Sequence, residues 1–312
     1  MVRVAVCVCT CDRAELLARL LAVLARVELN DLPPENVLVV VVDNRPDGTA
    51  RAVCDRLAPG LPVPLRFVEE PRPGISFARN RAVAAARAWG ADLVAFVDDD
   101  DVPASDWLRQ LVQRQRETGA DLVFGLYRLP QDLPLPGWLR NSRYFRPPNP
   151  EDLDRYGLPG WAGTYNVLIS RSVLEQLTIG DGPFRAEFAS SGGEDMDLFI
   201  RARTAGFTYA VAASSVVLRA WEPERMTVGG ILRRGFQRAG SRVMLARAHL
   251  PREQVRRLAW GSWGKLGKAL LLLPLVWNRS RLVRSLLGVT AALGELYAWS
   301  GLRYDFYLRR RG

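Results

Sequence analysis

Residues that bind metals or form disulfides are scarce in this sequence of 312 residues. It has four cysteines, a single histidine (His249) and no CxxC pair. Structural zinc sites use four Cys or His ligands at short spacings, whereas Cys7, Cys9 and Cys11 merely alternate and would share one face of a strand. We interpret these three as small apolar residues of a buried strand, with a metal site as the alternative. No disulfide framework is evident, which fits a reducing cytosol.

Long hydrophobic runs are also absent from the sequence. A membrane-spanning helix takes about 20 apolar residues. The run 269–277 is much shorter and is interrupted by Pro274, and the run 286–299 contains Glu295. Residues 2–9 are apolar, but they lead directly into a Cys-Asp-Arg turn without a small-residue cleavage site, so we expect no signal peptide.

Acidic residues are scarce in the last part of the chain. Residues 229–312 carry 17 Lys and Arg against 3 acidic residues, a balance of +14, so residues 1–228 have −4 when the whole chain has +10. The hydrophobic content of 48% and the charged content of 24% are those of a folded protein. We predict a globular domain over residues 1–228 and a basic helical tail over residues 229–312. Such a tail favours an anionic partner, either membrane phospholipid or nucleic acid.

The first half of the chain alternates apolar, strand-like runs with runs of helical spacing. Strands are predicted at residues 2–9, 37–43, 65–70, 92–98 and 121–127, and helices at 13–26, 48–57, 75–90 and 104–117. This order predicts an α/β domain whose largely parallel sheet is covered by helices on both faces. Farther along we predict a long loop, a strand, a helix, a Gly-rich loop entering a helix, and short strands, at residues 129–160, 164–170, 171–177, 190–206 and 209–219.

Polar residues directly follow several of the predicted strands. In sheets of this kind, ligands bind beyond the carboxyl ends of the strands. Thr10 and Asp12 follow the first strand, and Asp43 and Asn44 follow the second. The four aspartates of the run 98–101 follow the fourth. We therefore expect the functional site at this edge of the sheet.

The acidic run FVDDDD at residues 96–101 predicts a site for a metal and a donor substrate. Neighbouring carboxylates repel one another and are tolerated where a cation or hydrogen-bond donors neutralise them. Their oxygens are the ligands that Mg²⁺ or Mn²⁺ prefers, and such ions bridge proteins to diphosphates. We assign the metal to Asp98 and Asp100. The alternative is a solvated turn that caps the next helix, a role that we assign to Asp101 or Ser105.

A second cluster, SGGEDMDLF at residues 191–199, predicts a catalytic base. The glycines let the chain approach a ligand closely, and Glu194 and Asp195 open a helix whose N-terminal end favours negative charge. A carboxylate at this place can deprotonate an acceptor hydroxyl. The alternative is an ordinary helix N-terminus with two acids in its first turn.

Two further motifs are candidates for binding the donor. Asp43, in VVDNRPDGT, can accept hydrogen bonds from a base or a ribose, or it can form an Asx turn. Arg79 and Asn80, in GISFARNRA, can contact the donor and orient the acidic run, or they can lie on a surface face of the helix.

Together and in this order, these motifs resemble the family 2 glycosyltransferases of the GT-A fold. The matching segments, within residues 1–245, are VCVCTCDRAELL, VVVVDNRPDGT, PGISFARNRA, LVAFVDDDDVPASDWL, TYNVLISR and SGGEDMDLF. The resemblance extends to the bacterial exopolysaccharide branch, whose enzymes add glucose to lipid-linked succinoglycan intermediates. It implies a GT-A mixed sheet, a UDP-hexose donor, a divalent cation (Mg²⁺ or Mn²⁺), and a glycan or lipid-linked acceptor.

The same resemblance implies roles for individual residues. The uridine would be held by Thr10, Asp12 and Asp43. The ribose and the donor sugar would be contacted by Asp98 and Asp99, and the metal at the diphosphate by Asp100. Asp195 would be the base and Glu194 would orient the acceptor, in a direct in-line displacement that inverts the anomeric carbon.

One position departs from the family pattern. Many relatives place a His, as a further ligand of the metal or diphosphate, before a Pro-Glu-Arg, where VVLRAWEPER at residues 216–225 has Arg219. An arginine cannot bind a cation but pairs with phosphate oxygens. We hypothesise that Arg219, with Arg225 and Arg234, stabilises the departing diphosphate and lessens the dependence of activity on the metal.

The tail pattern predicts attachment to a membrane surface. Arg234, Arg238 and Arg242 are spaced four apart beside apolar residues, as in a cationic amphipathic helix. With Trp277 and Trp299 in Leu-rich stretches, the tail fits a bilayer interface better than nucleic acid, which we do not expect as a partner. We expect the protein at the cytoplasmic face of the inner membrane, peripheral or monotopic. The alternative for the tail is a helical subdomain that packs on the sheet.

Two other function classes share part of this pattern. A sugar-phosphate nucleotidyltransferase has a similar layout but needs a Gly-rich phosphate loop with Arg and Lys after the first strand, where this chain has CTCDRAELL. A non-enzymatic protein that binds a membrane or nucleic acid through the basic tail is the other alternative. Within the enzyme hypothesis, the candidates for the acceptor side are Trp161, Tyr165 and Asn166, with core packing as the alternative for Trp161.

Overall fold

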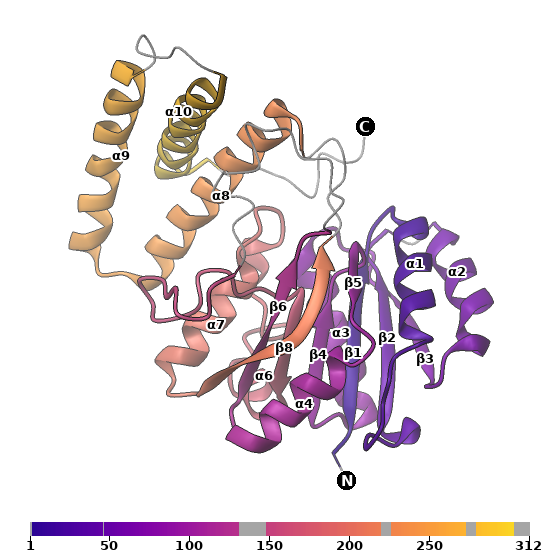
Figure 1. The fold of residues 1–312 in the computed structure, drawn as a ribbon. Coiled ribbons are helices and arrows are strands. Elements are labelled where there is room, and N and C mark those ends of the chain that lie inside the picture. Colours follow the sequence, from indigo (N-terminus) through magenta and orange to yellow (C-terminus); the bar gives the residue numbers. More distant parts are fainter. Residues whose placement is uncertain (1, 46, 131–147, 220–225, 273–278, 303–312) are drawn as a thin grey trace. The chain divides into compact units, whose positions relative to one another are not determined.

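The computed structural model describes residues 2–45, 47–130, 148–219, 226–272 and 279–302 (Figure 1). These residues form two compact units. The α/β unit consists of the described part of residues 2–189 together with residues 194–219. The helical unit consists of residues 190–193 and the described part of residues 226–302.

The α/β unit is built on an eight-stranded sheet with the strand order β3-β2-β1-β4-β7-β6-β8-β5. The strands are β1 (Val4–Thr10), β2 (Val37–Asp43), β3 (Leu65–Glu69), β4 (Leu93–Val97), β5 (Asp101–Pro103), β6 (Leu122–Arg128), β7 (Asn166–Ser170) and β8 (Tyr209–Arg219). The first four strands by sequence pair in parallel, as do β6 and β8, whereas β7 and β5 run antiparallel to their neighbours. The sheet is therefore mixed, and its parallel half is the part where strands and helices alternate in the sequence.

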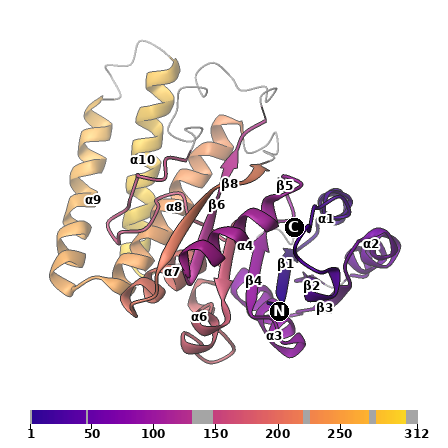
Figure 2. The ribbon, with the colours of Figure 1, turned by 60° about the horizontal axis from the view of Figure 1, so that its bottom comes forward.

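Helices cover both faces of this sheet (Figures 1 and 2). They are α1 (Ala14–Leu24), α2 (Thr49–Leu57), α3 (Ile75–Trp89), α4 (Trp107–Thr118), α6 (Arg171–Gln176) and α7 (Glu194–Thr204), with 3₁₀ turns at Pro34–Asn36, Ala58–Gly60 and Ala186–Phe188. Alternate residues of β1 pack against helices on opposite faces of the sheet, because successive side chains of a strand point to opposite sides. Val6 and Val8 join the core that also contains Leu17 of α1. On the other face, the thiol of Cys7 lies 3.9 Å from the carbonyl oxygen of Ala82 in α3.

Two of the three cysteines predicted to share a buried strand do so. Cys7 is buried and Cys9 is partly buried in β1, whereas Cys11 lies beyond the end of this strand at Thr10. In α2, Cys54 is a buried free thiol. Burial raises the pKa of Cys9 to about 12 and that of Cys54 to about 12. Such thiols are neutral at ordinary pH and are poor ligands or nucleophiles.

The segment after the fourth strand differs from the prediction. Residues 101–103 form the short strand β5, which pairs with the end of β8, so α4 begins at Trp107 and not at residue 104. The prediction that Asp101 serves only as a turn or capping residue is wrong. The antiparallel register places Asp101 opposite Arg219, and their opposite charges favour the buried pair.

The helical unit contains three helices, α8 (Val228–His249), α9 (Arg252–Leu272) and α10 (Arg279–Trp299), among the residues that the structure describes. Thr227 caps α8 by accepting a hydrogen bond from the N–H of Gly230 at 3.0 Å. The helix α10 packs against both α8 and α9. At Gly294 the backbone of α10 comes so close to α8 that a Cβ would lie 2.3 Å from the carbonyl oxygen of Phe236.

A buried carboxylate joins α9 to α10. Glu295 of α10 accepts a hydrogen bond from the hydroxyl of Ser262 at 2.6 Å and pairs with the ammonium of Lys265 at 2.8 Å. The indole N–H of Trp299 donates to the same hydroxyl at 3.1 Å. Because a buried charge is costly without partners, these contacts fix the register between the two helices. None of the helices within the described residues is long and apolar enough to cross a membrane.

Candidate functional site

The site begins where β1, β2 and β4 end side by side. The parallel register pairs Thr10 with Asp43, and β4 lies on the other side of β1. The run 98–101 follows β4 directly. The polar residues predicted at the carboxyl edge of the sheet are therefore brought together there, as expected for strands that point the same way.

Asn44 fixes the loop that leads from β3 into α3. Its amide nitrogen donates to the carbonyl oxygens of Glu70 at 2.9 Å and Arg72 at 2.7 Å, and its amide oxygen accepts from the N–H of Gly74 at 2.9 Å. Gly74 has φ of 134°, and a Cβ there would lie 2.7 Å from the Cβ of Ala189. The glycine thus lets the start of α3 approach the segment before α7, and α3 and α7 carry the next two site residues.

Asp99 is held inside the protein by two donors. The hydroxyl of Thr10 donates to it at 2.8 Å, and the guanidinium of Arg13 lies 2.9 Å away. Burial raises the pKa of Asp99 to about 6, against the effect of the Arg13 charge. Arg13 also lies 3.4 Å from Asp100. Sequence reasoning assigned no role to Arg13, although its place one residue after Asp12 in the turn that ends β1 was the available signal.

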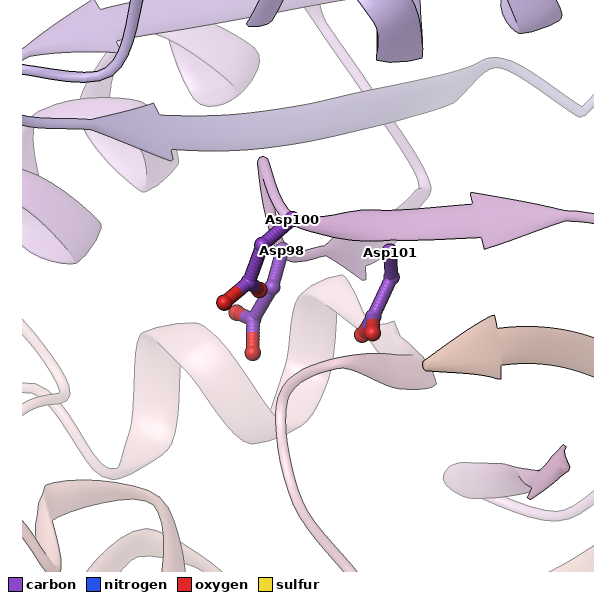
Figure 3. A group of neighbouring side chains, drawn as sticks. All are labelled: Asp98, Asp100 and Asp101. Carbon is purple, nitrogen blue, oxygen red and sulfur yellow. The ribbon is translucent and has the colours of Figure 1, made fainter. Parts of the chain in front are cut away.

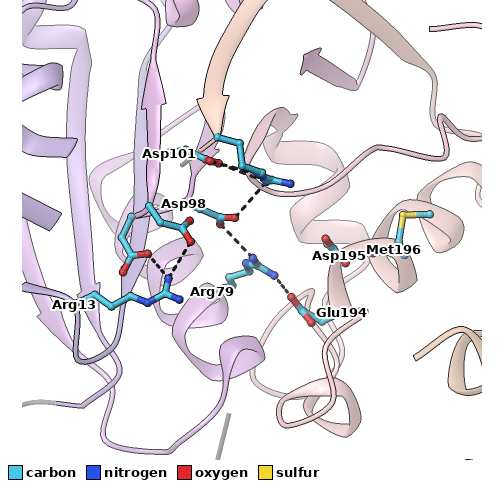
Figure 4. A network of polar contacts seen from close by, with 10 residues as sticks. Arg13, Arg79, Asp98, Asp101, Glu194, Asp195 and Met196 are labelled. Atoms are coloured by element: carbon cyan, nitrogen blue, oxygen red, sulfur yellow. Dashed lines mark hydrogen bonds and ion pairs between the residues drawn. The ribbon is translucent and has the colours of Figure 1, made fainter. Parts of the chain in front are cut away.

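A chain of charges connects the acidic run to the start of α7 (Figure 4). Arg79 of α3, whose side chain is 8% exposed, forms an ion pair with Glu194 and lies 3.7 Å from Asp98. Burial raises the pKa of Asp98, against the effect of the Arg79 charge. The predicted role of Arg79 in orienting the acidic run agrees with this geometry.

Asp195 follows Glu194 in the first turn of α7 and points into the same region (Figure 4). One of its carboxylate oxygens accepts a hydrogen bond from the N–H of Met196 at 2.8 Å. The second oxygen of Glu194 is buried and has no partner among the described residues. A buried acceptor without a donor is costly, which makes this oxygen a candidate acceptor for a donor from a ligand.

Arg219 is the last residue of β8, and its side chain lies beside the acidic run. Its guanidinium lies 3.4 Å from Asp101 and 3.9 Å from Asp98, and it stacks over the ring of Tyr165 at 4.0 Å and of Tyr127 at 5.1 Å. Burial raises the pKa of Asp101 to about 8, against the effect of the Arg219 charge. The two rings and two carboxylates hold the cation in one place.

Three carboxylates of the run form a group that fits a divalent cation (Figure 3). Among the described residues, oxygens of Asp98, Asp100 and Asp101 lie within 4.8 Å of one another. Carboxylates also outnumber arginines around them: the network holds Asp98, Asp99, Asp100, Asp101, Glu194 and Asp195 against Arg13, Arg79 and Arg219. The oxygen ligands suit Mg²⁺ or Mn²⁺, and Asp98 and Asp100 are the partly exposed members.

Asp43 lies at the end of β2 and is 1% exposed. One oxygen accepts a hydrogen bond from the N–H of Arg45 at 3.0 Å, while the other is buried without a partner among the residues described. Burial raises the pKa of Asp43 to about 6. The predicted Asx turn and the predicted acceptor are therefore both present, one on each oxygen. Nearby, Asp12 has φ of 57° and pairs with Arg45 at the surface.

Two amide residues predicted to bind ligands use their side chains within the protein. Asn80 donates to the carbonyl oxygen of Phe184 at 2.8 Å and accepts from the N–H of the same residue at 2.9 Å. Asn166 donates to the carbonyl oxygens of Leu126 at 3.0 Å and Ser215 at 3.1 Å, which ties β7 to β6 and β8. Both amides thus connect segments of the α/β unit to one another.

The aromatic residues predicted for the acceptor side are joined by a hydrogen bond. Tyr165 is buried beneath Arg219, and its hydroxyl donates to the carbonyl oxygen of Trp161 at 2.5 Å. The partly buried Trp161 donates its indole N–H to the carbonyl oxygen of Asn149 at 2.9 Å. Arg225 and Trp277, for which the sequence also predicted roles, lie outside the described residues, and Arg234 belongs to α8 of the helical unit.

Comparison with known proteins adds to this geometry. Residues 5–179 match the model of the family described as "Glycosyl transferase family 2". The chain is 30% identical over 251 residues to the succinoglycan biosynthesis protein ExoM of Rhizobium meliloti (strain 1021), covering 78% of this chain and 75% of ExoM.

Two solved structures show the same fold. The mannosyltransferase PcManGT from Pyrobaculum calidifontis, in complex with GDP-Man and Mn²⁺, is 21% identical and superposes with a TM-score of 0.61, covering 95% of this chain and 87% of that one. S. aureus TarS 1–349, in complex with UDP, is 17% identical with a TM-score of 0.53, covering 97% and 93%. These likenesses establish a GT-A mixed sheet followed by helices, as predicted.

Proposed function

This chain belongs to glycosyltransferase family 2 and is a glycosyltransferase of polysaccharide biosynthesis, and from that premise we propose that it transfers a hexose from a UDP-sugar to a hydroxyl of a lipid-linked glycan, with inversion. The observation that carries the proposal is the ion-paired chain from Asp98 through Arg79 to Glu194, with Asp195 beside it (Figure 4). In this chain, Arg79 lies between Asp98, which we assign to the donor, and Glu194, which directly precedes the proposed base Asp195.

The donor nucleoside would bind at the ends of β1 and β2. The unpartnered buried oxygen of Asp43 is an acceptor for an N–H of the base or a hydroxyl of the ribose. Thr10 and Arg13 hold Asp99 in place, and Asp98 projects from the neighbouring strand end. TarS, which shares this fold, binds UDP in its solved complex, and this supports a uridine nucleotide for the present chain.

The diphosphate would lie against the partly exposed carboxylates of the acidic run. Asp98 and Asp100 would hold a divalent cation, which when bound would neutralise charge on the departing diphosphate. The Mn²⁺ in the structure of PcManGT supports this assignment. Arg219 supplies a second positive charge, fixed by Asp101 and Tyr165, toward the same phosphate oxygens.

Asp195 acts as the base in this proposal. Its carboxylate takes the proton of the acceptor hydroxyl while the oxygen attacks the anomeric carbon. The bond between that carbon and the diphosphate breaks on the opposite face, and UDP leaves with the electron pair. The attack from one side and departure from the other inverts the anomeric configuration. Glu194, held by Arg79, offers its free oxygen to orient the acceptor.

The outer face of α9 supports a place at the membrane surface. Trp260 is 75% exposed and Trp263 61%, and Leu270 and Leu271 are exposed farther along the same face. Residues at these spacings lie on one side of a helix. Exposed tryptophans beside basic residues are typical of helices that lie in a bilayer interface. We propose peripheral attachment at the cytoplasmic face of the inner membrane, where a lipid-linked acceptor is accessible.

The test of the proposed chemistry is an Asp195→Asn variant assayed with UDP-glucose and UDP-galactose in Mg²⁺ or Mn²⁺. Without its base, transfer and slow donor hydrolysis should both fall by about 10²–10⁴-fold, while UDP binding stays within a factor of about two. Asp181→Asn, which alters an exposed carboxylate paired with Arg72, is the control and should leave the rate unchanged. An Asp195→Asn enzyme with the wild-type rate would show that another group is the base.

A further inference from the structure

A groove in the helical unit is lined by basic side chains from all three of its helices. Arg242 comes from α8, Lys265 and Lys268 from α9, and Arg284 from α10. Its volume of about 460 Å³ lies within the range of about 300–1,000 Å³ that is usual for small-molecule sites. Glu295 is the one acidic residue among those that line it, so the lining has an excess of positive charge.

The carboxylate in this groove is already satisfied. Glu295 accepts from Ser262 at 2.6 Å, and both of its oxygens lie within 2.9 Å of the Lys265 ammonium. By contrast, Arg242 and Lys268 form no ion pair with any residue that the structure describes. The groove therefore has cationic capacity beyond what its own carboxylate uses, and an anion would neutralise it.

Four of the residues that line the groove are small: Ala269, Gly288, Ala291 and Ala292. A Cβ on Gly288 would meet the Cβ of Ala269 at 3.3 Å, so α9 and α10 are already in close contact there. Because these four residues have a methyl group or no side chain, the groove that the basic residues also line has room for a compact anion.

The chemistry of the lining suits a phosphate group. Ammonium and guanidinium groups donate charge-assisted hydrogen bonds to phosphate oxygens, and several such groups around one site suit a group with several oxygens and more than one charge. The helix that supplies both lysines also exposes Trp260, Trp263 and Leu271 on its outer face. The helix α9 thus has two lysines that line the groove and, on another side, an exposed apolar face. A lipid with a phosphate head group matches both, because its head group suits the lysines and its apolar part suits the exposed face.

We propose that this groove binds the phosphate or diphosphate head of a lipid, as a site separate from the donor site of the α/β unit. The lipid source of the phosphate rests on the proposed membrane attachment; the phosphate chemistry rests on the groove alone. Two sources share this chemistry, a membrane lipid head group and a free phosphate compound, and the experiment below separates them.

The first measurement compares two double variants of the full chain with equal loss of charge. Arg242→Gln with Lys268→Gln alters the groove, and Arg256→Gln with Arg257→Gln alters exposed residues of the same unit that do not line it. Binding is measured to phosphatidylcholine vesicles that carry either phosphatidylglycerol or a long-chain isoprenoid diphosphate. The groove variant should bind at least one of these about tenfold more weakly than the matched variant, as expected for lost hydrogen bonds to a charged group.

The second measurement uses the unusual distribution of lysine. Lys265 and Lys268 are the only lysines in a chain with 43 Lys and Arg. An amine-acylating reagent therefore reports on this groove, with the α-amino group of the chain as an internal reference. Vesicles that carry the bound lipid should protect both lysines severalfold, and inorganic diphosphate alone should protect them much less.

The outcomes separate the possibilities. Equal weakening of vesicle binding in the two double variants would show general charge attraction and overturn the site. Full protection of the lysines by inorganic diphosphate would assign the groove to a free phosphate compound and overturn the lipid. Hydrolysis of UDP-glucose and of UDP-galactose is measured in parallel: if the wild type hydrolyses neither while groove binding holds, the proposed function fails and this inference stands. Circular dichroism melting of each variant confirms that it is folded.

Discussion

At the scale of single residues, Arg219 has the most unusual surroundings in the site. It lies between the carboxylates of Asp98 and Asp101 and over the ring of Tyr165, so its charge is fixed within the group that fits a cation. We propose that a permanent cation at this place performs part of the work of a metal ion. It also lowers the net negative charge that attracts a metal ion to the run.

We therefore expect Arg219→Gln to change the metal dependence of activity. The wild type should keep a measurable part of its activity in EDTA, whereas the variant should lose roughly 10²-fold with metal and all activity without it, because fixed charges that stabilise a transition state contribute this much. Steady-state rates over a Mn²⁺ titration measure the effect. Arg51→Gln, which alters a surface pair with Glu69, is the control. Complete loss of wild-type activity in EDTA together with a silent Arg219→Ala would refute this role.

A second residue-scale prediction concerns Asp43 and pH. Burial raises the pKa of Asp43 to about 6, so below pH 6 the carboxyl group of the free protein is protonated. The carboxyl group must lose this proton before it can accept a hydrogen bond from uridine. Uridine affinity should thus fall as the pH drops below about 6, by up to about tenfold per unit, and be constant above about 7. Calorimetry with uridine, which has no phosphate to titrate, measures this. Asp43→Asn should bind weakly with a flat profile; a wild-type profile in that variant would exclude Asp43.

The sequence located some site residues better than others, for a physical reason. Asp43 and Asp98 were predictable because each ends an apolar strand, and parallel strands end at one edge. Asn80 and Asn166 looked equally suited to ligands, yet their amides bond to backbone groups of Phe184 and Ser215. Those partners are 104 and 49 residues away in the sequence, and no local pattern reveals them.

At the scale of elements, strand order was harder to predict than strand position. The apolar runs gave the strands, but β7 inserts antiparallel between β4 and β6, and β5 adds to the edge beside β8. The strand β5 has only three residues, too few to show the alternation that marks a strand, so it could not be distinguished from a turn. Asp101, its first residue, was therefore wrongly assigned to a turn, and its partner Arg219 lies 118 residues away in the sequence.

The packing of α10 against α8 gives a prediction about stability. A Cβ at Gly294 would lie 2.3 Å from the carbonyl oxygen of Phe236, so Gly294→Ala should force the helices apart and cost about 1–3 kcal/mol in the helical unit. Gly261→Ala is the matched control, since nothing lies within 4 Å of its Cβ, and it should stabilise α9 by about 0.5–1 kcal/mol. Urea unfolding followed by circular dichroism measures both. Equal stability of the two variants would show that the close approach is absent.

At the scale of the whole molecule, charge divides the chain as its packing does. Residues 1–228 have a net charge of −4 and residues 229–312 of +14, and the helical unit contains the described part of the basic segment. We propose that the catalytic domain spans residues 1–228 and that the tail attaches it to a surface. The short segment 190–193 groups with the helical unit although it precedes α7 in the sequence, which no composition shift indicated.

We propose that the exposed tryptophans of α9 make a bilayer the surface that the tail prefers. Both anionic vesicles and oligonucleotides attract a segment of +14, and a bilayer also takes up an apolar helix face. Replacing Trp260 and Trp263 by Ser should weaken binding to vesicles containing phosphatidylglycerol by about 10²-fold or more, since each buried aromatic contributes about 1.5–3 kcal/mol. Trp89→Ser in α3 is the control and should float like the wild type. Raising the ionic strength from about 0.1 M to 1 M shortens the Debye length from about 10 Å to 3 Å and should release the Ser variant before the wild type.

A wild type that does not bind these vesicles but shifts oligonucleotides with a steep salt dependence would instead make nucleic acid the partner of the tail.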